Sequence, residues 1–398
     1  MYFSKLAVLA AAIFPLANAA QPAAGDIVPD QYIVMLKPGT SASDRQSHLD
    51  WLATLAPYGI ERTFGGHYNF NAYSGSFSRA IVDRISADPR VALVEPDRVW
   101  TLETVEEPLQ KRDINTQSNA PWGLGTVSHR QPGSTDYVYD SNAGEGTFAY
   151  VVDSGIRTSH VEFEGRAVNA FSVLPGVYLD LIGHGTHVAG TIGSRAYGVA
   201  KKATLVNVKV FIAPTTTTAM IMSGFDFAVN DIVSKNRTSV SAINMSLGGD
   251  YSEAFNTAVE EASKKGVISV VAAGNDAKDA QNVSPASAPS AITVGATDIK
   301  WNIATYSNFG KVLDIFAPGT NILSCWFRTD TDTNTISGTS MATPHTVGLA
   351  LYAMSVHGIH GVEAVAKFLT GSATKNGVQG AIHDSPNLLG NNNNNVSN

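Results

Sequence analysis

The chain has 398 residues, of which 44% are hydrophobic and 15% charged, and its formal net charge is -7 at pH 7. Such a composition can bury a large core, has room for more than one domain and excludes disorder throughout. It also lacks the basic excess that holds a nucleic-acid backbone, so we expect no nucleic-acid partner.

Residues 1–20 have the pattern of a cleaved secretory signal peptide. Lys5 is followed by an apolar run over residues 6–13 and by small residues up to Ala20. No later run reaches the roughly 20 apolar residues that cross a bilayer. We therefore expect a secreted, extracellular, soluble protein that has no membrane partner and is a monomer.

A small domain is predicted next. Strand-like runs alternate with helical patterns in the order strand, helix, strand, helix, strand, over residues 31–36, 41–55, 68–77, 79–88 and 91–97. This order predicts a small α+β unit, folded over about residues 29–100. Residues 104–119 are polar and show no periodicity, which places a domain boundary there.

From Trp122 onward, short apolar runs rich in β-branched residues alternate with helical patterns. The runs cover residues 148–152, 205–210, 240–245 and 267–273, and the helices lie near residues 185–194, 219–233 and 252–265. The pattern predicts an α/β fold with a parallel sheet and helices on both faces. Ligands of such folds bind beyond the carboxyl ends of the strands. Residues 391–398 form a polar, Asn-rich tail that we expect to be frayed.

The single cysteine, Cys325, cannot form an internal disulfide, although secreted proteins often carry disulfides. A chain of this size can rely on its core instead. Cys325 follows the strand-like residues 321–324 and has no histidine nearby in sequence, so we interpret it as a buried structural thiol rather than a nucleophile.

Three polar residues at predicted element ends form a candidate catalytic set. Ser340, in GTSMATPH over residues 338–345, enters a helical pattern, where free backbone N–H groups and the helix dipole stabilise negative charge. Asp153 ends the strand at residues 148–152 and can accept the Nδ1–H of a histidine. Taken alone, Ser340 could be an ordinary helix cap and Asp153 a turn residue.

His184 and His187 lie in GHGTHVAG over residues 183–190, three positions apart on one predicted helix. They could hold a metal, but zinc hydrolases commonly use a third ligand and a glutamate, as in H-E-x-x-H, which is absent here. We favour His184 as a general base and His187 as a packed, hydrogen-bonded residue. Asn275 follows the strand at residues 267–273, and its amide could donate to an oxyanion together with the N–H of Ser340.

The order Asp153, His184, Ser340, with the sequences VVDSGI, GHGTHVAG and GTSMATPH around them, resembles the subtilisin family of serine proteases, and most of all the proteinase K branch of secreted fungal subtilases. The likeness covers residues 120 to about 380. It implies that Ser340 is the nucleophile, His184 the general base and acid, Asp153 the orienting carboxylate and Asn275 the oxyanion donor. It also implies a subtilisin-like fold and an active serine endopeptidase that acts on proteins and peptides.

The same resemblance implies a substrate groove lined by two segments with small side chains. We expect a broad preference for aromatic or aliphatic residues before the cut bond, because such a groove is open and apolar. The residues concerned are Ser246, Leu247, Gly248, Gly249, Ala272, Ala273 and Gly274.

The small domain resembles the family's inhibitory propeptide, which implies a precursor with a signal peptide at residues 1–20, a propeptide at 21–112 and a peptidase domain at 113–398. The propeptide would be a partner and inhibitor of its own enzyme. Maturation is expected between about residues 110 and 117, by self-cleavage or by a dibasic-specific enzyme at Lys111-Arg112.

A structural calcium ion is also implied, with Pro289, Ala291 and Asp314 at the positions of the family's main site; oxygen ligands suit this hard cation. Glycosylation acceptors occur at Asn236, Asn282 and Asn395, and the one at Asn244 falls in a predicted buried strand.

The chain departs from the branch at Ile182 and Val188, and it lacks the branch's disulfides. The clearest departure is at residues 211–218, which replace an acidic, glycine-rich wall of the substrate groove. Pro214 removes a backbone donor there. Two rival functions also fit parts of the sequence: a catalytically inactive binding protein with the same fold, and a metal-dependent hydrolase that uses His184 and His187.

Overall fold

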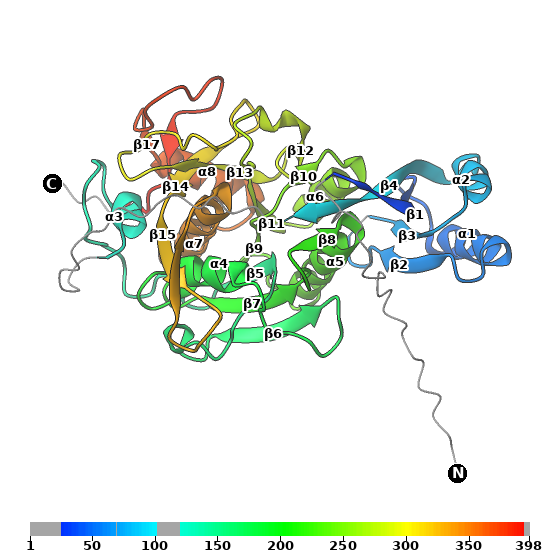
Figure 1. Ribbon diagram of the computed structural model, residues 1–398, viewed down its shortest axis with the longest axis horizontal. Coiled ribbons are helices and arrows are strands. Elements are labelled where there is room, and N and C mark those ends of the chain that lie inside the picture. Colours follow the sequence, from blue (N-terminus) through cyan, green and yellow to red (C-terminus); the bar gives the residue numbers. More distant parts are fainter. Residues whose placement is uncertain (1–24, 69, 102–119, 394–398) are drawn as a thin grey trace, which may run out of the picture.

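The computed structural model describes residues 25–68, 70–101 and 120–393 (Figure 1). The predicted signal peptide, the polar connection at residues 104–119 with Lys111-Arg112, and Asn395 lie outside the described residues.

The first domain is the predicted α+β unit. Its strands form one sheet in the order β2-β3-β1-β4, and helices α1 and α2 pack on it over a small separate core. Ser41 caps α1 by accepting the N–H of Asp44 at 3.1 Å. The sequence pattern missed β2 and made β3 too long. The elements are β1 (Ile27–Leu36), α1 (Ala42–Leu55), β2 (Ile60–Phe64), β3 (Ala72–Ser76), α2 (Arg79–Ser86) and β4 (Val91–Thr101).

The second domain contains a sheet of nine strands in the order β17-β18-β14-β13-β11-β9-β5-β7-β6. From β18 to β6 every pairing is parallel, and β17 pairs antiparallel at the edge. The sheet strands are β5 (Phe148–Asp153), β6 (Ala167–Ser172), β7 (Thr204–Lys209), β9 (Ser241–Met245), β11 (Ile268–Ala272), β13 (Ile292–Thr297), β14 (Ile315–Pro318), β17 (Thr374–Lys375) and β18 (Leu388–Leu389).

Helices and short strands complete this domain. The helices are α3 (Trp122–Ser128), η1 (Val161–Phe163), α4 (His184–Gly193), α5 (Thr218–Ser234), α6 (Glu253–Lys264), η2 (Ala280–Asn282), α7 (Thr339–His357) and α8 (Val362–Ser372). The short strands are β8 (Thr215–Thr217), β10 (Gly249–Asp250), β12 (Val283–Ser284), β15 (Ile322–Cys325) and β16 (Thr333–Ile336).

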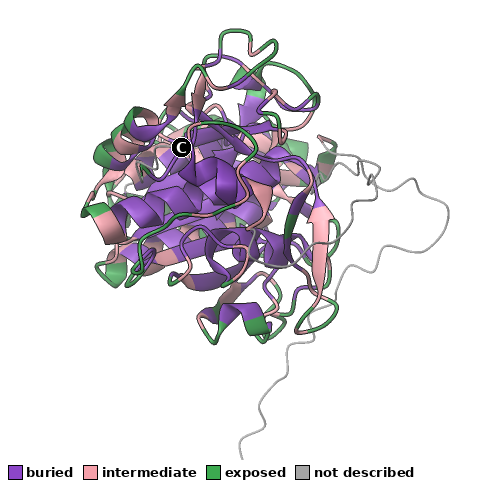
Figure 2. Cartoon of the chain, turned by 90° about the vertical axis from the view of Figure 1, so that its left-hand side faces the viewer, coloured by how far each residue is buried: buried purple, intermediate pink, exposed green. Residues whose placement is uncertain are grey.

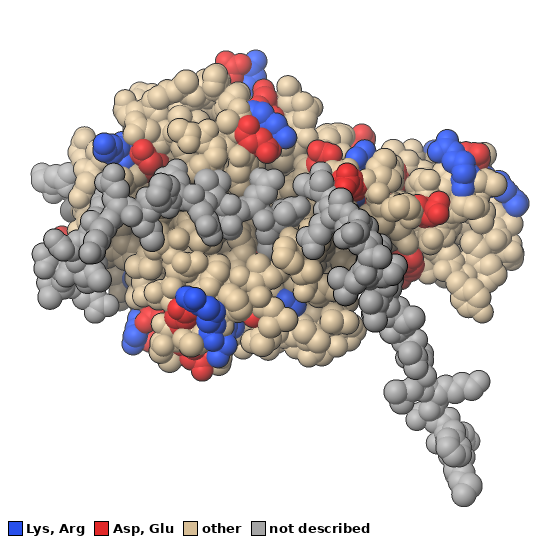
Figure 3. All heavy atoms as spheres, in the orientation of Figure 1, with Lys and Arg blue, Asp and Glu red and all other residues tan. Residues whose placement is uncertain are grey.

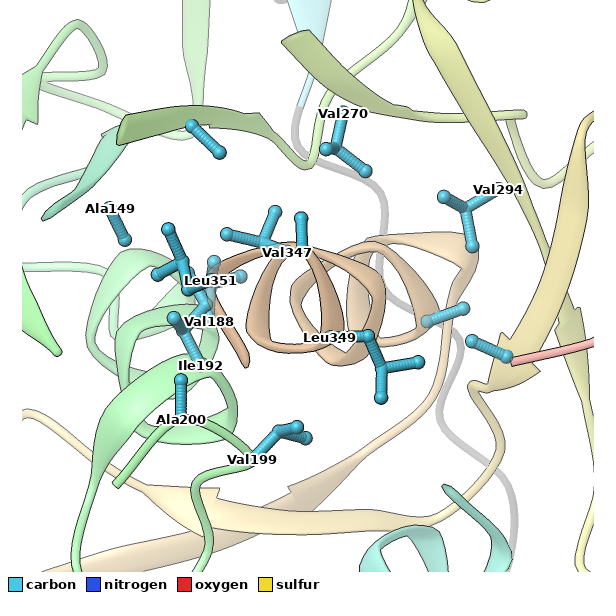
Figure 4. Close-up of a cluster of buried hydrophobic side chains, with 14 of the residues drawn as sticks. Ala149, Val188, Ile192, Val199, Ala200, Val270, Val294, Val347, Leu349 and Leu351 are labelled. Atoms are coloured by element: carbon cyan, nitrogen blue, oxygen red, sulfur yellow. The ribbon is translucent and has the colours of Figure 1, made fainter. Parts of the chain in front are cut away.

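Helices cover both faces of the sheet, as predicted. Alternate residues of β5 point to opposite sides: Ala149 and Val151 join a core with α4 and α7, whereas Tyr150 and Val152 join one with α5 and α6. Helix α7 is buried over residues 339–354 and packs through Val347 and Leu351 in the first of these cores (Figure 4). Figure 2 shows the resulting buried centre, with exposed residues at the periphery.

The two domains share a β-ladder. Strand β4 of the first domain pairs antiparallel with β8 of the second, with Trp100 opposite Thr216, so the first domain lies against α5 and α6 (Figure 1). Trp100 is 1% exposed, donates from its indole N–H to Thr218 Oγ1 at 2.9 Å and packs against Phe255. Strand β8 lies within residues 211–218, the segment for which the sequence analysis expects a departure from the resembled branch.

The expectation of a frayed tail from residue 391 is wrong for its first residues. Asn391 and Asn392 are each 1% exposed, and their side-chain amides donate to the carbonyls of His129 and Val138 at 2.9 and 2.8 Å. Polar side chains can be buried when backbone acceptors satisfy them, which composition alone does not reveal.

Charged side chains on the face in Figure 3 stand in small groups in which both signs occur. Among the described residues, none of the helices combines the length and apolar character needed to span a bilayer.

Candidate active site

The predicted catalytic residues lie at element ends on the carboxyl side of the sheet. Asp153 is the last residue of β5, His184 is the first residue of α4, and Ser340 is the second residue of α7. Asn275 follows β11 by three residues. Because the carboxyl ends of parallel strands meet at one edge, residues far apart in sequence gather there.

Asp153 and His184 form a buried hydrogen-bonded pair. His184 Nδ1 lies 2.8 Å from Asp153 Oδ1 and 3.0 Å from Oδ2, and the two side chains are 2% and 0% exposed. A carboxylate at Nδ1 keeps the proton on that nitrogen and leaves Nε2 as a base. His184 can begin a helix there because Gly183 has φ +100°, and a Cβ at Gly183 would lie 2.6 Å from the rings of Trp326 and Phe327.

Ser340 is anchored by Ser246 through two hydrogen bonds. Ser340 Oγ donates to the Ser246 carbonyl at 3.1 Å, and Ser246 Oγ donates to the Ser340 carbonyl at 2.8 Å. The second bond has a cause inside α7: Pro344 has no N–H, so it cannot donate to the carbonyl four residues earlier. Ser246 therefore replaces the helical hydrogen bond that Pro344 removes.

The structure forms no hydrogen bond between Ser340 and His184. His184 Nε2 is buried and has no partner among the described residues, while Ser340 Oγ is bonded to Ser246. The two residues start helices that pack against each other in one core. Hydrogen bonds between a nucleophile and its base are often long or absent before substrate binds.

Asn275 has a defined orientation next to Ser340. Its Oδ1 accepts the backbone N–H of Thr339 at 2.8 Å and the Thr339 hydroxyl at 2.9 Å. A backbone N–H can only donate, so the contacting atom must be the amide oxygen. The Nδ2 donor is thereby directed away from Thr339, and both Asn275 and Ser340 line the same pocket.

That pocket has a volume of about 190 Å³ and lies beside Ser340. Five of the seven predicted groove residues line it: Leu247, Gly248, Gly249, Ala272 and Gly274. The other two do not.

Ser246 contacts Ser340 as described, and Ala273 packs in a separate apolar core. The pocket is also lined by Asp250 and Lys278, and by Gly25 from the first domain. The sequence pattern had not indicated these three residues.

His187 is packed and hydrogen-bonded, as expected. It is 0% exposed, and its Nε2 donates to the Ile322 carbonyl at 2.8 Å. Burial lowers its pKa to about 3, so it is neutral near pH 7. His187 bonds a carbonyl through Nε2, whereas His184 bonds Asp153 through Nδ1. The described residues contain no cluster of three metal-ligating side chains.

Cys325 ends β15 and is completely buried, which agrees with a structural thiol. Burial raises its pKa to about 12, so the nucleophilic thiolate is strongly disfavoured.

Asp314, one of the predicted calcium ligands, is a partly buried carboxyl group. Its Oδ2 accepts the backbone N–H of Thr293 at 2.8 Å, and burial raises its pKa to about 6. No ion pair of Asp314 occurs in the part of the chain that the structure describes. Pro289 and Ala291 lie just before β13, which pairs with β14 close to Asp314. A carboxylate without an ion-pair partner among the described residues is the kind of oxygen ligand that suits a calcium ion.

Two of the glycosylation acceptors lie at the surface. Asn236 is exposed directly after α5 with φ +54°, and Asn282 is exposed in η2. Asn244 is 0% exposed within β9, as its sequence context predicted.

Asp180 is a residue that the sequence analysis missed. It is 0% exposed and accepts the N–H groups of Ile182 and Gly183 at 2.9 and 2.8 Å and that of Thr186 at 3.0 Å, which caps the start of α4. An aspartate before a Gly-His helix start was the available signal.

Comparisons with known proteins identify two families in the chain. The subtilase family model matches residues 144–390, and the peptidase inhibitor I9 model matches residues 31–103. Alkaline protease 1 of Aspergillus clavatus is 50% identical over 396 residues, covering 96% of each chain. The alkaline proteinase of Hapsidospora chrysogena is 48% identical and covers 97% of each chain.

Among solved structures, a cold-adapted subtilisin-like serine proteinase matches with a TM-score of 0.64 and 40% sequence identity, over 68% of this chain and 98% of that chain. The fold, the two matched domains and these relatives together show a serine endopeptidase that carries an I9 inhibitor domain as its propeptide. The chain belongs to the subtilase family.

Proposed function

We propose that Ser340 is the nucleophile of this endopeptidase, that His184 is its general base and acid, and that Asp153 orients His184. The observation that carries this proposal is the buried Asp153–His184 pair, in which His184 Nε2 has no partner among the described residues. His184 starts a helix that packs beside the one that presents Ser340. A buried imidazole nitrogen without a partner is costly, and a hydroxyl proton is the partner it lacks.

The reaction follows from these positions. Ser340 Oγ turns from the Ser246 carbonyl toward His184 Nε2, gives up its proton and attacks the peptide carbonyl. The resulting oxyanion accepts hydrogen bonds from Asn275 Nδ2 and the Ser340 N–H. His184 then protonates the departing amine, which leaves an acyl-enzyme on Ser340, and water hydrolyses this ester by the same route in reverse.

Substrate preference is proposed to be broad, with an aromatic or aliphatic residue before the cut bond. The lining by Leu247, Gly248, Ala272 and Gly274 supports this preference, because small side chains leave room for a large apolar one. A panel of short peptides cleaved best after lysine or aspartate would refute it.

We further propose a secreted precursor with a signal peptide at residues 1–20, a propeptide at 21–112 and a peptidase domain at 113–398. The I9 match and the β4–β8 ladder support inhibition by the propeptide, because Trp100 of β4 lies against the pocket residue Gly249. Cleavage is proposed between about residues 110 and 117, by the enzyme itself. A Ser340→Ala precursor that still matures would instead favour processing at Lys111-Arg112 by another enzyme.

Calcium is proposed to bind at Asp314 and the carbonyls of Pro289 and Ala291, where it would stabilise the fold and take no part in the chemistry. Glycosylation is proposed at Asn236 and Asn282, and Asn395 remains a candidate from sequence. Mass analysis before and after removal of N-linked glycans tests these acceptors.

Single and combined substitutions test the catalytic assignment. Ser340→Ala, His184→Ala and the double variant should each lower kcat by about 10⁶-fold, the loss known for such residues in subtilisin, with almost no further loss in the double variant. Residues that act as one unit show this non-additivity. Independent losses that multiply, or retained activity in Ser340→Ala, would contradict the assignment.

A further inference from the structure

Two buried charged residues outside the proposed catalytic set lie next to the Asp153–His184 pair. Asp180, in the segment before α4, and Lys209, the last residue of β7, are both 0% exposed. Burying a charge is costly unless it is paired or well hydrogen-bonded, so the placement of both charges at this site needs an explanation.

Asp180 has five hydrogen-bond donors. Besides the three backbone N–H groups that begin α4, it accepts the hydroxyl of Ser154 at 3.0 Å and that of Thr186 at 2.6 Å. In all five contacts Asp180 is the acceptor. It therefore fixes the turn from which His184 projects.

Lys209 approaches the same site from the neighbouring strand. It lies opposite Asp153 in the β5–β7 register, and its Nζ donates to the carbonyl of Ser154. Burial lowers the pKa of Lys209, whereas the negative charges of Asp180 and Asp153 raise it. The described contacts thus place an ammonium group within the electrostatic reach of both carboxylates.

Ser154 contacts three of the four groups, namely Asp153, Asp180 and Lys209. Its N–H donates to Asp153 at 2.7 Å, its hydroxyl donates to Asp180 and accepts the N–H of Gly185 at 2.9 Å, and its carbonyl accepts from Lys209. With neutral His184, the charges of Asp153, Asp180 and Lys209 sum to -1. With His184 protonated, as it is during catalysis, the cluster is neutral.

We propose that Asp180 and Lys209 are positioning residues that set, in opposite directions, how tightly the Asp153–His184 pair holds the catalytic proton. The negative charge of Asp180 favours the imidazolium, and the positive charge of Lys209 opposes it. This inference rests on the catalytic roles proposed above for Asp153 and His184.

Other charged groups near His184 do not duplicate this effect. His187, on the same helix, is neutral near pH 7 because burial lowers its pKa to about 3. Arg157, whose N–H contacts Thr186, is paired with Asp330 at 2.6 Å at the protein surface. Within the described residues, Asp180 and Lys209 are therefore the charges to vary.

The test is the pH dependence of kcat/KM in the mature enzyme on a neutral peptide substrate. Asp180→Asn should move the acid-side midpoint down by about one pH unit, because it removes a negative charge, and Lys209→Met should move it up by about one unit. The double variant should return close to the wild-type midpoint. Lys209→Arg keeps the charge and should also keep the midpoint.

Lys202→Met is the matched control, because Lys202 is an exposed lysine paired with Glu145 at 2.9 Å. It should leave the midpoint unchanged. Circular dichroism and thermal unfolding establish that each variant is folded. If Asp180→Asn does not fold, Lys209→Met against Lys209→Arg decides the question.

Lower kcat with wild-type midpoints in folded variants would overturn the inference and leave both residues with a purely structural role. Shifts in the same direction would also overturn it. Failure of the catalytic assignment is distinguishable, because Ser340→Ala would then retain activity whatever the midpoints of the other variants.

Discussion

Asn275 is proposed to act only when negative charge develops on the substrate. Its amide oxygen is bonded to Thr339, so only the nitrogen is left for an oxyanion. Asn275→Ala should therefore lower kcat by about 10²–10³-fold, the loss known for such a donor in subtilisin, with little change in KM. Steady-state kinetics on one peptide substrate measure this. A raised KM with unchanged kcat would assign Asn275 to ground-state binding instead.

Asn302→Ala is a suitable control, since Asn302 bonds Asp298 and does not line the pocket. Its kinetics should match those of the wild type.

The residues proposed to do the chemistry could be named from sequence, because each stands in or next to a short motif at the end or start of a predicted element. Asp180 was not predictable in this way, because backbone N–H groups and hydroxyls make up its contacts and these appear only in the folded turn. The contact of Ser246 with Ser340 could not be predicted for a similar reason. It depends on the Ser340 carbonyl, which Pro344 leaves without its helical donor.

At the scale of elements, β4 of the propeptide places two acidic residues at helix starts of the peptidase domain. Asp97 accepts the N–H of Ala219 at 3.1 Å, at the start of α5, and Glu95 accepts the hydroxyl of Ser252, the cap of α6. Burial raises the pKa of both carboxyl groups. Carboxylates at helix N-termini are stabilising, so these contacts help hold the propeptide on the enzyme.

Removing either cap should weaken inhibition by the propeptide. Loss of one cap costs about 1 kcal/mol, which corresponds to a roughly fivefold higher inhibition constant for Glu95→Ala or Asp97→Ala. Titration of the mature enzyme with each added propeptide variant measures the inhibition constant. Asp83→Ala, at an exposed site on α2, is the control. Inhibition constants equal to that of the control would rule out capping as a source of affinity.

Long periodic segments were predicted well: α5, α6 and the central strands match within one or two residues. Short elements such as β2 and β8 were missed, because their five and three residues carry too little periodicity. Strand β8 forms a ladder only because β4 lies beside it, and no local pattern contains that partner.

For the whole molecule, Asp314 links stability to pH and calcium. Its pKa is raised from 3.8 to about 6, so its protonated form is favoured in the folded protein without metal. The raised pKa of Asp314 adds to the free energy of unfolding below about pH 4. This added stability is lost as the pH rises through 6. Calcium should restore stability above pH 6, because it binds the ionised carboxylate.

Thermal unfolding of the Ser340→Ala precursor, which cannot digest itself by the proposed mechanism, measures this effect in chelator and in calcium. Asp314→Asn should lose both the calcium response and its share of the decline between pH 4 and 6. An unchanged melting temperature in chelator would remove calcium from the account.

The central claim is that distant parts of the chain converge to activate one serine. Labelling the mature enzyme with a fluorophosphonate probe, followed by peptide mapping, tests this convergence. We expect one label on Ser340 that is lost in His184→Ala and in the unprocessed precursor. A label on another residue, or no label in an enzyme that cleaves peptides, would contradict the claim.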